Sequence, residues 1–235
     1  MVQIKVLDTG VLIGMCIEID QHHTKCFDYV VEDDCKEIYI TPTVGSEFKR
    51  ISKVVRQKLS QSIGEHRQKV VREFNDEKLG RDRLRYIRDS VLDSKNRSYR
   101  FLYEYYSEKL KNRVSVDKLE ILMDLNDMET EVWMDACQEY GGWKSFVSGW
   151  NKGIDTYSDV EKDLLVCEGD DPHVCLEAHH VAVNTGKVTE LGTTNPRHFI
   201  DKRVGEPESR KDNILRITDL RDVKDLSCDK VPTGS

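Results

Sequence analysis

The sequence has few of the residues that mark fibrous or low-complexity proteins, with only 14 glycines and 5 prolines in 235 residues. No apolar run approaches the ~18 residues that a membrane-spanning helix requires, so we expect no contact with a membrane interior. Asp8 interrupts the first apolar stretch and no small-residue cleavage site follows, which argues against a secretory signal. What remains is a globular chain, long enough to bury a core within one large domain.

The seven cysteines include no CxxC pair, which favours free thiols in a reducing, cytoplasmic setting. A Walker loop, a GxGxxG turn and a GxSxG nucleophile turn are also missing. Two groups contain residue types that bind zinc, but neither has the paired spacing of a structural zinc site. They comprise His22, His23, Cys26 and Cys35, and Cys167, His173, Cys175, His179 and His180.

Charge is distributed unevenly along the chain. The total is 36 Lys and Arg against 43 Asp and Glu, a net charge of −7 that by itself argues against a nucleic-acid partner. Residues 49–113, however, hold 19 basic and 9 acidic residues, whereas the rest holds 17 basic and 34 acidic ones. Such segregation creates a local positive field, which indicates either a polyanion partner or a solvated helix face.

Short apolar runs followed by helix starts predict an α/β fold. Residues 2–7 read as a buried strand that ends at Asp8, before a short helix from about Val11 to Cys16. Residues 38–40 read as a second strand, followed by Thr41 and Pro42, a capping residue and a helix-starting proline.

The middle of the sequence has helical periodicity and no strand signal. Apolar residues at helical spacing predict a helix over 44–74 and further helices up to about Val132, with polar breaks at 75–82, 93–98 and Gly141-Gly142.

The strand and helix alternation returns near the C-terminus. Asp171-Pro172 predicts a helix start, Gly186 its end, and 188–192 and 214–217 two strands. The sequence thus predicts one α/β domain over residues 1–225, with a mostly parallel sheet, a helical insertion at approximately 50–160, and a disordered tail at 226–235.

Acidic residues lie where the predicted parallel strands end. Asp8 follows the first strand, Glu47 lies in the helix after the second, and Asp170 and Asp171 precede the helix that leads into the third. Ligands bind at this edge of open parallel sheets, and clustered carboxylates select hard cations such as Mg²⁺ or Mn²⁺. Taken singly, Asp8 and Asp171 are equally well explained as helix caps, and Glu47 as a helix residue favoured by the dipole.

Four segments of the sequence resemble, in order, the four signature blocks of PIN domains. They are VLDTGVL (6–12), ITPTVGSEF (40–48), DPHVCLEA (171–178) and LGTTNPRHF (191–199). The resemblance covers roughly residues 2–50 and 160–220. It implies a three-layer α/β/α fold and a metal-dependent ribonuclease, a class that includes VapC-type toxins and RNA-processing nucleases.

The resemblance also implies roles for individual residues. Asp8, Glu47 and Asp171 match the three acids that bind Mg²⁺ or Mn²⁺ in the family. Asn195 stands where many members have a fourth acid, which brings an amide oxygen without charge. Thr9 matches the hydroxyl residue after the first acid, and Thr193 the one before the fourth position. Asp170 and His198 are candidates to replace part of the missing fourth acid.

The implied reaction is endonucleolytic hydrolysis of RNA by a metal-activated water, leaving a 5′-phosphate and a 3′-hydroxyl. Asn195 motivates an alternative, in which a catalytically weak or inactive PIN-like module binds RNA or a protein partner. A third hypothesis is a toxin whose acidic cleft is occupied by an antitoxin peptide.

Cations and aromatic residues alternate in the predicted insertion, a pattern typical of surfaces that bind single-stranded RNA. The candidate RNA-binding residues are Arg97, Tyr99 and Arg100, followed by Phe101, Tyr103, Tyr105 and Tyr106. The competing interpretation is a buried helix face, which is favoured for Phe101 and Tyr105, or a helical arm that forms a homodimer.

Overall fold

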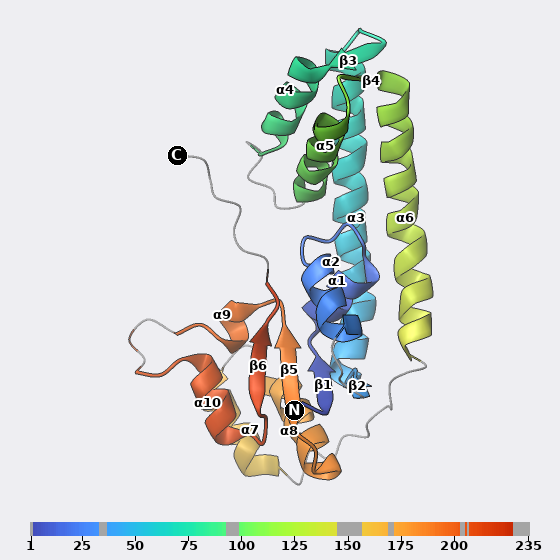
Figure 1. The fold of residues 1–235 in the computed structure, drawn as a ribbon. Helices are drawn as coiled ribbons and strands as arrows, with labels where there is room; N and C mark the ends of the chain where they lie inside the picture. The colour runs from blue at the N-terminus through green and yellow to red at the C-terminus, as the bar shows by residue number, and fades with distance from the viewer. Residues whose placement is uncertain are drawn as a thin grey trace. The chain divides into compact units, whose positions relative to one another are not determined.

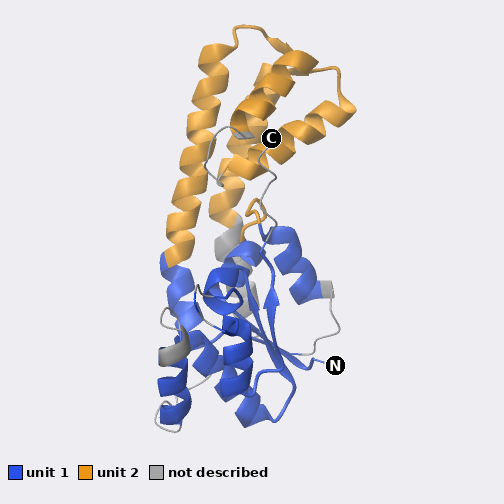
Figure 2. Ribbon diagram, turned by 90° about the vertical axis from the view of Figure 1, so that its left-hand side faces the viewer, with its two compact units in different colours: residues 1–16, 22–50, 139–235 blue, residues 17–21, 51–138 orange. Residues whose placement is uncertain are grey.

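The computed structural model divides the chain into two compact units (Figure 2). The first unit comprises residues 1–16, 22–50 and 139–235, and the second comprises 17–21 and 51–138. The structure describes residues 2–32, 37–92, 99–144, 157–168, 172–202, 205 and 207–227.

The first unit is built on a four-stranded sheet in the order β2-β1-β5-β6, in which all strands run parallel (Figure 1). The strands are β1 (Ile4–Leu7), β2 (Glu37–Tyr39), β5 (Thr189–Thr193) and β6 (Asp222–Asp225). The two central strands are fully buried, although only β1 is a largely apolar run and β5 has Leu191 as its one large apolar side chain. The predicted α/β class with a mostly parallel sheet is confirmed.

Helices connect these strands. They are α1 (Thr9–Cys16), α2 (His23–Phe27), the π-helical turn η1 (Asp28–Glu32), α7 (Ser158–Glu168), α8 (Pro172–Thr185), α9 (Pro196–Phe199) and α10 (Arg210–Ile217). Side chains of α1, α2 and η1 form an apolar cluster with Leu7 and with Leu226, beyond β6. Helix α8 ends before Gly186, whose φ of 61° is the left-handed conformation that glycine adopts at such ends.

The second unit is mainly helical. Helix α3 (Pro42–Glu73) contributes residues 42–50 to the first unit and 51–73 to the second. The other elements are β3 (Lys78–Gly80), α4 (Arg81–Leu92), α5 (Arg100–Asn112), β4 (Ser115–Asp117) and α6 (Lys118–Lys144), whose residues 139–144 return to the first unit. Strands β3 and β4 pair antiparallel, so the prediction of a purely helical middle was wrong at these two short segments.

Three further predictions are corrected. Residues 214–217 are the end of helix α10, and the last strand lies later, at β6. Helix α6 continues through Gly141 and Gly142, where a break was expected. The predicted tail starts too early, because Leu226 is buried and its N–H donates a 2.8 Å hydrogen bond to the carbonyl of Thr193; the rest of that tail, from residue 228, lies outside the described residues.

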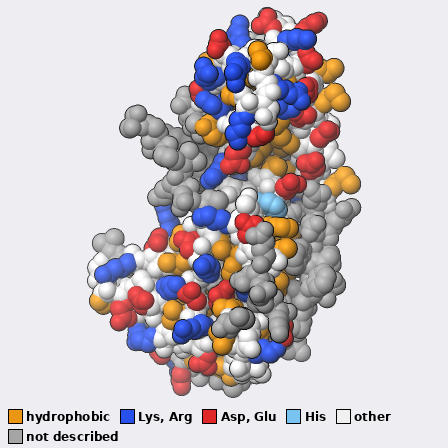
Figure 3. All heavy atoms as spheres, viewed as in Figure 1, with side chains coloured by type: hydrophobic (Ala, Val, Ile, Leu, Met, Phe, Trp, Pro, Cys, Tyr) orange, Lys and Arg blue, Asp and Glu red, His pale blue; other side chains and the backbone are white. Residues whose placement is uncertain are grey.

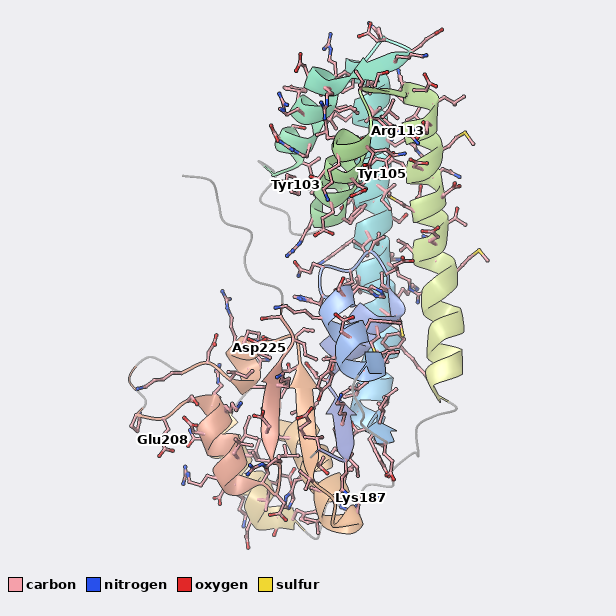
Figure 4. All side chains as sticks on the ribbon, in the orientation of Figure 1. Tyr103, Tyr105, Arg113, Lys187, Glu208 and Asp225 are labelled. Carbon is pink, nitrogen blue, oxygen red and sulfur yellow. The ribbon has the colours of Figure 1, made fainter. Side chains whose placement is uncertain are left out.

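The basic excess of the second unit is largely balanced by α6. Residues 51–138 carry 18 Lys and Arg and 16 Asp and Glu, and seven of those acids follow residue 113. Lys109 of α5 lies 2.6 Å from Glu120 and 2.7 Å from Asp124 of α6. Arg113 also binds Glu120, and Tyr105 donates to Asp124; both side chains lie on the side of α5 toward α6 (Figure 4). Basic and acidic side chains are accordingly intermixed on the visible surface of this unit (Figure 3).

Candidate active site

Asp8 lies directly after β1, at the carboxyl end of the sheet. Its N–H donates a 2.9 Å hydrogen bond to the carbonyl of Gly192 in the neighbouring strand β5, which brings it beside Thr193. Its side chain is buried, with 5% exposed. The prediction that Asp8 follows a strand is confirmed, and the structure places the LGTTN segment (191–195) next to it.

Both carboxylate oxygens of Asp8 accept hydrogen bonds. The hydroxyl of Thr193 donates to Oδ2 at 2.9 Å, and the N–H of Thr9 donates to Oδ1 at 2.6 Å. The N–H of Asn195 in turn donates to the Thr193 hydroxyl at 2.9 Å, so that hydroxyl is oriented toward Asp8. These contacts fix the direction of the Asp8 carboxylate.

Glu47 is joined to this group through Thr9. The Thr9 hydroxyl donates to Glu47 Oε2 at 2.6 Å, while Arg50 lies 3.8 Å from Glu47 Oε1. Glu47 is in the second turn of α3, so its carboxylate comes from a different element than Asp8. The structure therefore brings together two of the three predicted acids, with Thr9 between them.

The third acid is not described. Asp170 and Asp171 both lie outside the described residues, although α8 begins at Pro172 as the sequence predicted. Asn195 is half-buried at the start of α9, and its side chain does not cap that helix. The predicted fourth position therefore lies next to Thr193 at the same sheet edge.

The chemistry of these donors fits a hard cation. Carboxylate, hydroxyl and amide oxygens are the ligands that Mg²⁺ and Mn²⁺ prefer. Within the described part of the chain, no three His, Cys, Asp or Glu side chains lie close enough to hold an ion together. Asp8 and Glu47 would supply two oxygen ligands, with Asn195 beside them.

The sequence did not predict two buried charged residues of the first unit. Lys5 of β1 is fully buried, where its ammonium donates to the carbonyl of Tyr29 and lies 4.1 Å from the centre of the Tyr29 ring. Glu177 of α8 is also buried and binds Thr43. No signal in the sequence indicated the burial of Glu177, because its helical spacing places it on the same face as the polar residues His173, His180 and Asn184.

Three of the histidines considered for zinc, His23, His179 and His180, make other contacts. His179 Nδ1 accepts a 3.0 Å hydrogen bond from the N–H of Asp219, and the ring of Tyr157 packs edge-on against His179 and His180. Burial lowers the pKa of both histidines. His23 Nδ1 lies 2.8 Å from the carbonyl of Gly14. These contacts indicate structural roles.

The predicted RNA-binding residues of the insertion are mostly engaged with neighbouring acids. Tyr99 donates to Glu65 at 2.9 Å, and Arg100 lies 2.9 Å from Glu104, whereas Arg97 lies outside the described residues. Of the aromatic residues, Phe101 and Tyr106 are buried, and Tyr105 is half-buried and bound to Asp124. The buried-face interpretation is thus confirmed for Phe101.

Comparisons of the chain with protein-family models, with curated proteins and with solved structures give no match. No helix in the described parts of the chain has the length and apolar character needed to cross a membrane.

Proposed function

We propose that the chain is a Mg²⁺- or Mn²⁺-dependent endoribonuclease with a three-layer, PIN-like fold. The observation that carries the proposal is the Asp8–Thr9–Glu47 group, which lies at the carboxyl end of parallel strands. From the sequence blocks, Asp171 and Asp170 would add further oxygen ligands to the proposed site together with Asn195, and single-stranded RNA is the proposed substrate.

In this mechanism Asp8 and Glu47 bind the cation, and Thr9 and Thr193 hold the two carboxylates in place through the hydrogen bonds described above. A bound Mg²⁺ or Mn²⁺ supplies a water of lowered pKa and neutralises charge that develops on the phosphate. Arg50, which is largely exposed beside Glu47, offers a cation for the RNA backbone.

The test is cleavage of a broad RNA pool by the full-length protein in Mn²⁺, compared with Asp8→Asn. We expect the substitution to reduce cleavage at least ~100-fold, because it removes a charged ligand from the centre of the group. Asp225→Asn is the matched control, since Asp225 ends strand β6, which β5 separates from β1, is exposed and accepts a local hydrogen bond from the N–H of Ser227. Equal cleavage by the wild type and Asp8→Asn would refute the proposal.

Asn195 favours one second candidate, a PIN-like module that binds RNA without cleaving it. The amide brings no charge to the fourth position, so the site holds a second ion less firmly than an all-acidic one. RNA binding that persists in EDTA and weakens with salt, without any cleavage in Mn²⁺, would favour this candidate over the nuclease.

A further inference from the structure

Glu177 is a buried carboxylate that faces the first turn of another helix. Only 1% of its surface is exposed. Its Oε1 accepts a 2.7 Å hydrogen bond from the hydroxyl of Thr43, and its Oε2 accepts a 3.3 Å hydrogen bond from the N–H of Thr43. Burial of a carboxylate is unfavourable unless donors of this kind compensate it. The contact is therefore a specific one between α8 and α3.

The donor end of this contact lies on the helix that carries Glu47. Thr43 is in the first turn of α3, where backbone N–H groups have no partner within the helix and the helix dipole favours a negative charge. Glu47 follows four residues later, so the two side chains lie on the same face of α3, one turn apart. A shift of the first turn would consequently displace Glu47.

Beyond Glu47, the hydrogen bonds continue to Asp8. Glu47 Oε2 accepts from the Thr9 hydroxyl at 2.6 Å, and the Thr9 N–H donates to Asp8 Oδ1 at 2.6 Å. The contacts between Glu177 and Asp8 thus run through the Thr43 side chain, one turn of α3 to Glu47, and the hydroxyl and N–H of Thr9. All of these residues belong to the first unit.

We propose that Glu177 and Thr43 are positioning residues for the candidate metal site, which hold Glu47 at the place where it binds the ion together with Asp8. The inference rests on the proposed function. Neither residue contacts the ion in this arrangement; they act through α3. Residues that orient metal ligands in this way typically contribute about 10- to 100-fold to metal affinity.

The experiment is a calorimetric titration of the whole chain with Mn²⁺ in the absence of RNA, which measures the affinity for the ion. Glu177→Gln places an amide NH₂ against one of the two Thr43 donors, and Thr43→Val removes the hydroxyl at nearly constant shape. We expect each variant to bind Mn²⁺ about 10-fold more weakly or worse. Thr43→Ser keeps the hydroxyl and should bind within about 3-fold of the wild type. The double variant should be no weaker than the worse single variant, because both changes break one contact.

Thr218→Val is the matched control for a general loss of stability. Thr218 is buried, whereas Thr43 is half-buried, and the Thr218 hydroxyl donates to the carbonyl of Ile214 at 2.7 Å. We expect Thr43→Val and Thr218→Val to lower the melting temperature in EDTA to a similar degree, whereas only Thr43→Val weakens Mn²⁺ binding. Equal weakening by Thr218→Val would overturn the positioning role.

Asp8→Asn separates this inference from the function on which it rests. If Asp8→Asn abolishes Mn²⁺ binding while Glu177→Gln and Thr43→Val bind like the wild type, the positioning inference alone is wrong. If the wild type binds no Mn²⁺, or if Asp8→Asn binds it equally well, the metal site is wrong and the inference falls with it.

Discussion

The hydroxyl of Thr9 donates a 2.6 Å hydrogen bond to the carboxylate of Glu47, a residue 38 positions later in the chain. The N–H of the same threonine donates to Asp8. One small residue thus contacts two carboxylates that arise from different elements, and it sets the spacing between them. A carboxylate pair held apart in this way can share one cation.

Replacement of Thr9 tests that spacing. Thr9→Val keeps the shape and the backbone donor but removes the hydroxyl, so Glu47 loses its link to Asp8. We expect cleavage of RNA at saturating Mn²⁺ to fall at least ~10-fold in Thr9→Val and to stay within about 3-fold of the wild type in Thr9→Ser. Initial rates with a labelled RNA measure both. A fully active valine variant would show that the hydroxyl has no part in the proposed site.

Replacement of two glycines by alanine should change the free energy of unfolding in opposite directions. An alanine Cβ at Gly10 would lie 2.0 Å from the Thr194 hydroxyl, so the Thr194 side chain must rotate or the loop that carries it must shift, and we expect a loss of about 1–3 kcal/mol of unfolding free energy. At Gly64, within α3, nothing lies within 4 Å, and we expect a gain of about 0.5–1 kcal/mol because alanine favours a helix. Thermal unfolding of both variants gives the signs, and destabilisation at Gly64 would contradict the second expectation.

His66 should make the second unit sensitive to acid. The side chain is 5% exposed and pairs with the hydroxyl of Tyr106 at 2.8 Å. Burial, with a smaller effect of Lys69, lowers the pKa of His66 to about 4. Below its ordinary pKa of about 6.5 the unfolded chain binds a proton that the folded chain does not, so stability falls as the pH drops from about 6.5 toward 4.

An NMR titration of the His66 ring measures this pKa directly. The loss of unfolding free energy between pH 7 and pH 4.5 should be smaller in His66→Gln than in the wild type, by an amount of up to about 3 kcal/mol. A His66 ring that titrates near its ordinary pKa would contradict the burial argument.

Much of the fold follows from local signals in the sequence. The run before Asp8, the Thr41-Pro42 helix start and the Asp171-Pro172 helix start correctly predicted β1, α3 and α8. These signals work because a buried parallel strand and a helix that begins at proline each have a pattern independent of the rest of the chain. Asp8 then lies beside Thr193 because the carboxyl ends of neighbouring parallel strands lie at the same edge of the sheet.

The C-terminal strand was misplaced because tertiary pairing outweighs local preference. Branched residues at 214–217 suggested a strand, but the reciprocal hydrogen bonds of Ser209 and Asp212 start a helix there. The true strand, β6, has the sequence Asp-Val-Lys-Asp with one buried residue, Val223. At the edge of the sheet, backbone pairing with β5 defines it, and a four-residue segment with one apolar side chain gives no usable pattern.

Buried polar pairs were equally hard to predict. Glu177 and His66 lie in helices whose periodicity correctly marked the apolar positions, yet each finds its partner in another element, at Thr43 and Tyr106. The sequence shows that such a residue is present, but the partner is known only once the elements pack.

The balance of charge between α6 and the segments before it has a practical consequence for fragments of this protein. A fragment of residues 51–113 would lack the seven acidic residues of 114–138 and would hold 17 Lys and Arg against 9 Asp and Glu; Lys109 and Arg113 would also lose their ion pairs with Glu120. Such a truncated polycation would adsorb to any nucleic acid, heparin or anionic resin, with a steep dependence on salt. RNA binding by that fragment would therefore reflect non-specific electrostatic attraction that the truncation itself creates.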